Sequence, residues 1–187
     1  MDALFSGAHL HLLVNHVPIL GALFALALLV ASYGYAGDVL RRSAYVVLVG
    51  TALAASASDY SGTAAKEAIR GLPGVSRDQI RAHEEVAEKA YLGAAIVGAL
   101  ALGALVRWPR TPVPRGATLV MLLGTAVVSG AMAYTGLLGG RVRHTEVRPG
   151  AVPSGTMSVE PTRASRPVPR GEALHEQGTA RGEKGFR

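Results

Sequence analysis

The stretch His9-Leu10-His11-Leu12-Leu13-Val14-Asn15-His16-Val17-Pro18 leads into an apolar run that continues to about Tyr33 and decides the fold. A membrane-spanning helix needs about 20 mainly apolar residues, so the span must reach back past Pro18 to roughly Leu12. Pro18 then lies inside the span, where it removes a backbone donor and is expected to kink the helix. Polar and ionisable side chains at such a place are expensive to bury and usually mark a functional site. No Lys or Arg precedes the run, so we expect a retained helix and not a secretory signal peptide.

Further apolar runs follow the first, separated by polar turns. Ser76-Arg77-Asp78-Gln79 reads as a capping box that starts the third run, and Gly139-Gly140 is expected to end the fourth. Residues 61–81 form the only sizeable internal loop that we expect. The fold class predicted is an all-α membrane protein, a four-transmembrane-helix bundle over residues 1–148. The expected helices are at about 8–33, 43–58, 77–107 and 117–138.

The C-terminal segment 149–187 differs in composition from the rest of the chain. It is rich in Pro, Gly, Ser, Thr, Arg and Glu and has few apolar residues, so we expect an extended, largely irregular arm that orders only on a partner. Four spans place the N-terminus, the long loop and this arm on one side of the membrane. The two short turns carry Arg41, Arg42, Arg107, Arg110 and Arg115, which favours a cytoplasmic position for the turns and an outer one for the N-terminus.

Composition excludes several classes of function. The net charge of +6 is not accompanied by an ordered basic motif with aromatic stacking residues, so nucleic acid is not an expected partner, whereas membrane lipid is. The chain has no cysteine, which excludes disulfides, Cys-ligated zinc, iron–sulfur clusters and covalent c-type haem attachment. A metal or haem site would therefore use His, carboxylate or Met.

The histidines are the strongest candidates for such a site, because the four spans bring most of them to one membrane face. A six-coordinate b-type haem needs two neutral imidazoles, a slot between helices and basic groups for its propionates. Asn15, Glu84 or Glu146 could hold the second ring nitrogen of a ligating histidine, and Arg141, Arg143 or Arg81 could meet the propionates. The histidines at this face are His9, His11, His16, His83 and His144.

Two alternatives remain open on the residues alone. A divalent ion could be bound by carboxylates together with histidines, although the Glu-x-x-His pairs expected of a di-iron bundle are missing. The residues considered for that ion are Glu67, His83, Glu84, Glu88, His144 and Glu146. The other alternative is a cofactor-free structural subunit, whose helices and arm anchor a larger membrane complex.

Three segments resemble motifs of a poorly characterised bacterial family of four-helix, cytochrome-b-like predicted membrane proteins. They are Leu13-Val14-Asn15-His16-Val17-Pro18-Ile19-Leu20-Gly21, His83-Glu84-Glu85-Val86-Ala87 and Gly139-Gly140-Arg141-Val142-Arg143-His144-Thr145-Glu146. The resemblance covers about residues 8–148. It implies His16, His83 and His144 as the haem-iron candidates. His9 and His11 fall outside the three motifs and are candidates for a second site.

These inferences together predict a redox subunit of a complex more than a stand-alone enzyme. We expect a multi-pass protein of the bacterial inner membrane that binds haem b near the outer face. It would pass electrons between quinol, or a membrane partner, and an external carrier such as a c-type cytochrome or a cupredoxin.

Overall fold

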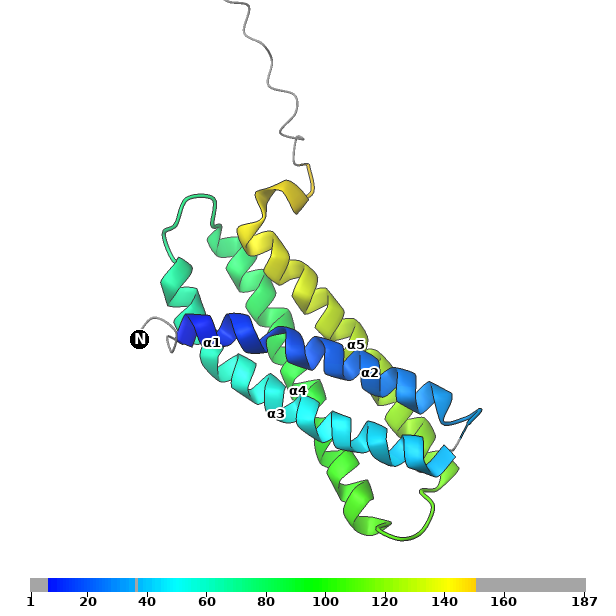
Figure 1. Cartoon of the computed structure of the whole chain (residues 1–187). Coiled ribbons are helices and arrows are strands. Elements are labelled where there is room, and N and C mark those ends of the chain that lie inside the picture. Colours follow the sequence, from blue (N-terminus) through cyan, green and yellow to red (C-terminus); the bar gives the residue numbers. More distant parts are fainter. Residues whose placement is uncertain (1–6, 36, 151–187) are drawn as a thin grey trace, which may run out of the picture. The chain divides into compact units, whose positions relative to one another are not determined.

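The computed structural model describes residues 7–35 and 37–150, and every regular element in this part of the chain is helical (Figure 1). The predicted all-α fold is thereby confirmed for the described residues. Of the predicted arm of residues 149–187, only Pro149 and Gly150 belong to the described residues. The elements are α1 Gly7–Val14, α2 His16–Ala31, α3 Gly37–Ile69, α4 Arg77–Arg107, α5 Arg115–Arg143 and the short 3₁₀ helix η2 Thr145–Val147.

The first span, predicted as one helix over 8–33 with a kink at Pro18, runs from Gly7 to Ala31 and is interrupted at Asn15 between α1 and α2. Proline lacks an N–H, and its ring clashes with the carbonyl of the residue four positions earlier, which here is Val14. The chain accordingly interrupts the helix at Asn15, whose N–H still donates to the carbonyl of His11 at 2.9 Å. Pro18 then sits in the first turn of α2, where backbone N–H groups have no intrahelical partner anyway.

The second span, α3, is much longer than the predicted 43–58. At its start, Arg42 forms an ion pair of 2.7 Å with Asp38 one turn earlier, which supports a helix beginning at Gly37. At its other end, Ser61 donates back to the carbonyl of Ala57 at 2.8 Å, and good helix formers continue the helix to Ile69. The loop expected over 61–81 therefore shrinks to residues 70–76.

The third and fourth spans differ in how well the sequence predicted them. Helix α4 has the predicted bounds, although the Ser76 side chain makes no capping hydrogen bond. Helix α5 continues through Gly139-Gly140, which was expected to end it, and stops at Arg143. A glycine inside a helix costs only about 1 kcal/mol relative to alanine, so packing against neighbouring helices can carry α5 across the pair.

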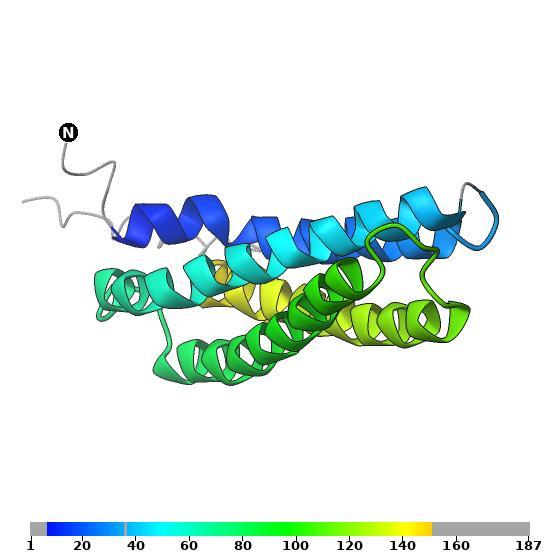
Figure 2. The same ribbon diagram turned by 90° about the horizontal axis from the view of Figure 1, so that it is seen from below.

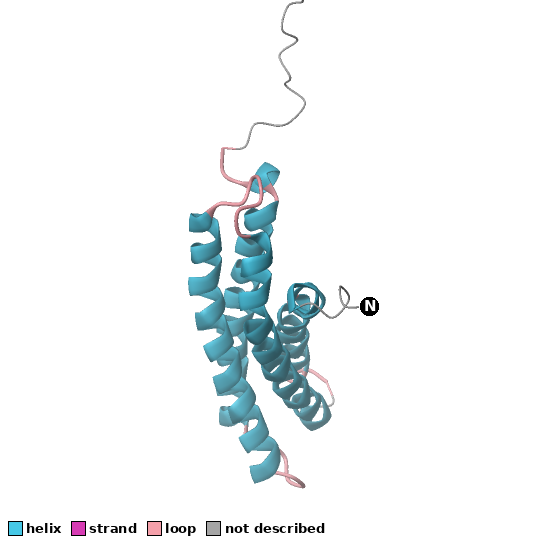
Figure 3. Ribbon diagram, turned by 90° about the vertical axis from the view of Figure 1, so that its left-hand side faces the viewer, coloured by secondary structure: helices cyan, strands magenta, loops and turns pink. Residues whose placement is uncertain are grey.

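The long helices form a closed ring in which α2 and α4 each pack against both α3 and α5, while α1 lies along the end of α3 (Figures 1 and 2). Short loops join them (Figure 3). The core is lined largely by small residues, with Tyr45 as the largest fully buried side chain. Within the described ranges, four segments are long and apolar enough to cross a membrane: Gly7–Ala31, α3, α4 and α5. Large apolar side chains such as Leu20, Leu53 and Val127 face outward, as lipid requires.

Residues 32–35 and 108–114 form one end of the bundle, which we call the turn end. One arginine at this end bonds to two segments of the chain. The Arg42 guanidinium donates to Asp38 and to three backbone carbonyls of the α4–α5 connection. The acceptors are Asp38 Oδ2 at 2.7 Å, Trp108 O at 2.7 Å, Thr111 O at 2.6 Å and Pro109 O at 3.2 Å. Arg42 thereby ties the start of α3 to the loop that joins α4 and α5.

We expect Gly98→Ala to destabilise the bundle, because a Cβ at this position would lie 2.5 Å from Ala52 Cβ and 3.2 Å from the Leu48 carbonyl oxygen. Overpacking of this kind costs about 1–3 kcal/mol. Gly103→Ala on the same helix is the matched control, since nothing lies within 4 Å of the added Cβ there. Unfolding in detergent, followed by circular dichroism, measures both; equal stability of the two variants would contradict the close contact.

Arg42→Ala should lower the free energy of unfolding by about 2–3 kcal/mol, because hydrogen bonds to a charged group contribute about 1.5–3 kcal/mol. Arg42→Lys should recover only part of this loss, since one ammonium cannot reach all four acceptors. Arg110→Ala serves as the control, because its exposed side chain has no partner among the described residues. A loss for Arg42→Ala no larger than that of the control would refute this role.

Candidate functional site at the histidine end

The histidines predicted to meet at one membrane face do share one end of the bundle. His9 and His11 lie on α1, His16 starts α2, His83 lies in the second turn of α4, and His144 follows α5. The chain direction of these helices places all five opposite the turn end (Figure 1). We call this end, formed by α1, the last turns of α3 and α5 and the first turns of α4, the histidine end.

His11 is half-buried between α1 and α3, and its ring has a defined orientation. Its Nδ1 lies 3.0 Å from the Ser58 carbonyl oxygen and 3.2 Å from Ser61 Oγ. A carbonyl oxygen can only accept, and the Ser61 hydroxyl already donates to the Ala57 carbonyl. The proton of His11 therefore resides on Nδ1, and Nε2 of the neutral ring carries a lone pair.

His83 is half-buried between α4 and α5 and repeats this arrangement. Its Nδ1 lies 3.1 Å from the Thr135 carbonyl oxygen and must donate to it. The ring fits against α5 because residue 139 is glycine; a Cβ there would lie 3.2 Å from His83 Cε1. His83 therefore also presents an unprotonated Nε2 when its ring is neutral.

His11 on α1 and His83 on α4 both lie at the histidine end. Metal-ligating histidines almost always donate their second ring N–H to a carbonyl or a carboxylate, which fixes the tautomer and the orientation of the ring. Both histidines have that outer hydrogen bond to a backbone carbonyl on a neighbouring helix. They thus form a pair of oriented imidazoles contributed by different spans.

The other predicted ligands lie in more open surroundings. His16 is exposed and has no hydrogen-bond partner within the described ranges. His144 is exposed as well, and its Nδ1–H donates to Glu146 Oε1 at 2.8 Å. The Glu146 backbone N–H and His144 both hydrogen-bond that carboxylate, and they hold the pKa of Glu146 below its usual value. His9 is half-buried on α1.

Three of the supporting residues predicted from sequence are Asn15, Arg141 and Arg143, and the first two contribute buried polar atoms without a partner. Asn15 Oδ1 and Arg141 Nε are both inaccessible to solvent and make no hydrogen bond in the described part of the chain. Such an atom costs about 1–3 kcal/mol when it stays unpaired. Arg143, the third residue, is exposed. Asn15 and Arg141 thus provide unused hydrogen-bonding capacity at the histidine end.

Two of the carboxylates considered for a divalent ion have other partners. Glu84 pairs with Lys66 at 2.6 Å, and Glu67 pairs with Arg70 at 3.1 Å. Within residues 7–35 and 37–150, no three His, Asp or Glu side chains converge as a metal site of that kind requires. The structure therefore does not bring Glu67, His83, Glu84, Glu88, His144 and Glu146 together.

Sequence reasoning missed the acceptors that orient the two imidazoles. Ser61 was assigned to a loop because α3 was expected to end at Ser58, and the Thr135 carbonyl is a backbone group that no side-chain pattern reveals. A usable signal was present for His11. It lies one turn before Asn15 and directly between two leucines, and Ser58 and Ser61 are spaced to face a single partner.

No known protein family, curated protein or solved structure matches this chain. The cytochrome-b-like family of four-helix membrane proteins therefore stays a resemblance based on the three quoted motifs.

We expect Gly139→Val to displace the His83 ring and to break its hydrogen bond to Thr135, because the added side chain would occupy the space of Cε1 and Nδ1. Gly140→Val is the matched control, since nothing lies within 4 Å of a Cβ at that neighbouring position. Nitrogen NMR of histidine-labelled protein distinguishes a protonated Nδ1 from a protonated Nε2. An unchanged His83 signal in Gly139→Val would contradict the contact.

Proposed function

We propose that this chain is a membrane-embedded electron-transfer subunit that holds a b-type haem at the histidine end, with His11 and His83 as the axial ligands. The observation that carries the proposal is the shared orientation of these two rings. Each donates Nδ1–H to a backbone carbonyl, at 3.0 Å for Ser58 and 3.1 Å for Thr135, and so keeps Nε2 for a ligand.

The donor set at this end fits such a group. Two neutral imidazoles from different helices are the ligands that a six-coordinate haem requires, and the absence of cysteine is compatible with non-covalent binding. The unpaired Arg141 Nε and Asn15 Oδ1 would gain partners from propionates and from the water bound to them. When bound, haem would supply a one-electron redox centre, while the chain fixes the rings and limits access of water.

His11 replaces His16 in this proposal for a geometric reason. Helix α1 packs along the end of α3, and this contact turns His11 toward Ser58 and Ser61 while His16 faces outward. His16 and His144 remain the ligands implied by the family resemblance. Their exposure makes them weaker candidates, because an axial ligand is normally shielded from water together with its haem.

A haem near one membrane face suits exchange between a quinol dissolved in the lipid and a carrier in the aqueous phase. We place the histidine end at the outer face of the bacterial inner membrane, because the short turns at the other end carry arginines that favour the cytoplasm. A c-type cytochrome or a cupredoxin is the external partner that this arrangement would serve, and the arm of residues 149–187 would contribute to docking.

His11→Ala and His83→Ala should each abolish the reduced-minus-oxidised bands of a b-type haem in purified protein while leaving membrane insertion intact. Each removes one of two axial ligands, and an imidazole lost from a six-coordinate site is not replaced by the exposed histidines. His16→Ala and His144→Ala are the controls and should keep the full bands. Absorption spectra of the purified proteins, supplied with haem during expression, measure all four variants.

Two outcomes would contradict the proposal in different ways. Loss of the bands in His16→Ala or His144→Ala, but not in His11→Ala, would assign the ligands to the family motifs instead of the oriented pair. A featureless spectrum of the wild-type protein, with no haem retained after expression in its presence, would favour the cofactor-free anchor subunit.

A further inference from the structure

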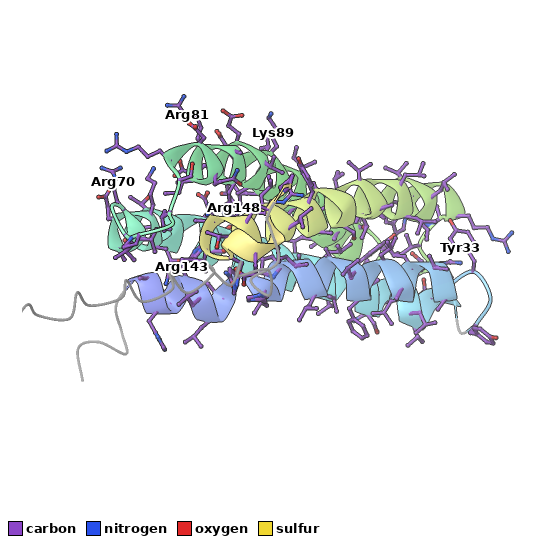
Figure 4. The ribbon with its side chains drawn as sticks, turned by 90° about the horizontal axis from the view of Figure 1, so that it is seen from above. Tyr33, Arg70, Arg81, Lys89, Arg143 and Arg148 are labelled. Carbon is purple, nitrogen blue, oxygen red and sulfur yellow. The ribbon has the colours of Figure 1, made fainter. Side chains whose placement is uncertain are left out.

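A basic cavity of about 310 Å³ lies where α3 ends and α4 begins, and the proposed haem site does not use it. Its volume is at the lower end of the range of about 300–1,000 Å³ that is usual for ligand pockets. Arg70 follows α3 and Arg81 lies on α4. Figure 4 shows both at the same end of the bundle as Arg143 and Arg148. The lining residues are Lys66, Arg70, Gly71, Val75, Arg77, Ile80, Arg81 and Glu84.

The cations of this cavity are not all neutralised by the protein. Lys66 pairs with Glu84, the one acidic residue in the lining, and Arg70 pairs with Glu67. Arg77 and Arg81 have no ion-pair or hydrogen-bond partner within residues 7–35 and 37–150. They are four positions apart on α4, where like charges repel one another across one turn. The cavity therefore offers two unpaired guanidinium groups on one wall.

The length of α4 places this cavity at the membrane surface. Helix α4 has 31 residues, or about 46 Å at 1.5 Å per residue. A bilayer with its headgroups is about 40–45 Å thick, so a moderately tilted α4 extends from one headgroup layer to the other. Trp108 follows its last residue, as expected of an aromatic anchor in the first layer. Arg77 and Arg81 then lie in the opposite headgroup layer.

We propose that this cavity binds the phosphate-bearing headgroup of an anionic phospholipid. Arg77 and Arg81 would donate to the phosphate oxygens, because guanidinium groups match phosphate geometry. Val75 and Ile80 give the lining an apolar part that suits the glycerol backbone. The proposal does not depend on the haem proposal, since it uses none of the histidines.

The test uses the full-length protein in detergent, titrated with phosphatidylglycerol or with phosphatidylcholine, and native mass spectrometry to count bound lipid. We expect the wild-type protein to retain phosphatidylglycerol in preference to phosphatidylcholine. Arg77→Gln/Arg81→Gln should weaken retention of phosphatidylglycerol roughly 30-fold, because two basic side chains near the headgroup are lost. Arg110→Gln/Arg115→Gln is the control, with the same change of charge on exposed residues at the turn end.

Three results would overturn the proposal. Equal retention of phosphatidylglycerol by wild-type and Arg77→Gln/Arg81→Gln would exclude the cavity as the site. Equal losses in both double variants would show a dependence on net charge alone. The third result concerns inorganic phosphate added to the lipid-free protein. If it stabilised the wild type as much as phosphatidylglycerol does, and did not stabilise Arg77→Gln/Arg81→Gln, the cavity would be assigned to a soluble phosphate. Circular dichroism verifies that each variant is folded. Arg81→Gln alone is a milder substitution that tests the same cavity if the double variant does not fold.

Discussion

Close approach of helices at glycine is the constraint on which the rest of this bundle depends. In lipid there is little hydrophobic drive between helices, so they associate through close van der Waals packing at small residues. Each side of the ring has a glycine facing a side chain of the neighbouring helix. The contacts are Gly21 with Thr51, Gly98 with Ala52, Gly124 with Val97 and Gly136 with Ile19.

These contacts fix the relative register of the helices, and the register brings the histidines together. Gly136 against Ile19 sets α5 beside α2, and one turn further along α5, Gly139 meets the ring of His83. On the other side, Gly7 lies so close to Ala64 that α1 is held along the end of α3, where His11 reaches Ser58. At the turn end, Arg42 ties the start of α3 to the α4–α5 connection. The pair of oriented imidazoles is thus a consequence of helix packing.

The sequence predicted the fold class and the shared end of the histidines, because long apolar runs and chain connectivity determine both. It also predicted the bounds of α4, which Ser76 precedes and Trp108-Pro109 follows. It failed at the C-terminal ends of α3 and α5. Ser61 was taken as loop, yet its hydroxyl bonds to its own helix, and Gly139-Gly140 was taken as a stop, yet α5 continues to Arg143.

The choice of His11 over His16 could not have come from the sequence, because it depends on where the helix is interrupted. An unbroken helix over 8–33 would place His9 and His16 on one stripe, two turns apart, and would point His11 elsewhere. Pro18 instead interrupts the helix at Asn15, and α1 packs against α3 while α2 packs against both α3 and α5. The same proline that made this stretch look like a kinked span therefore frees His11 to pack against α3. Pro18 itself is buried in the first turn of α2.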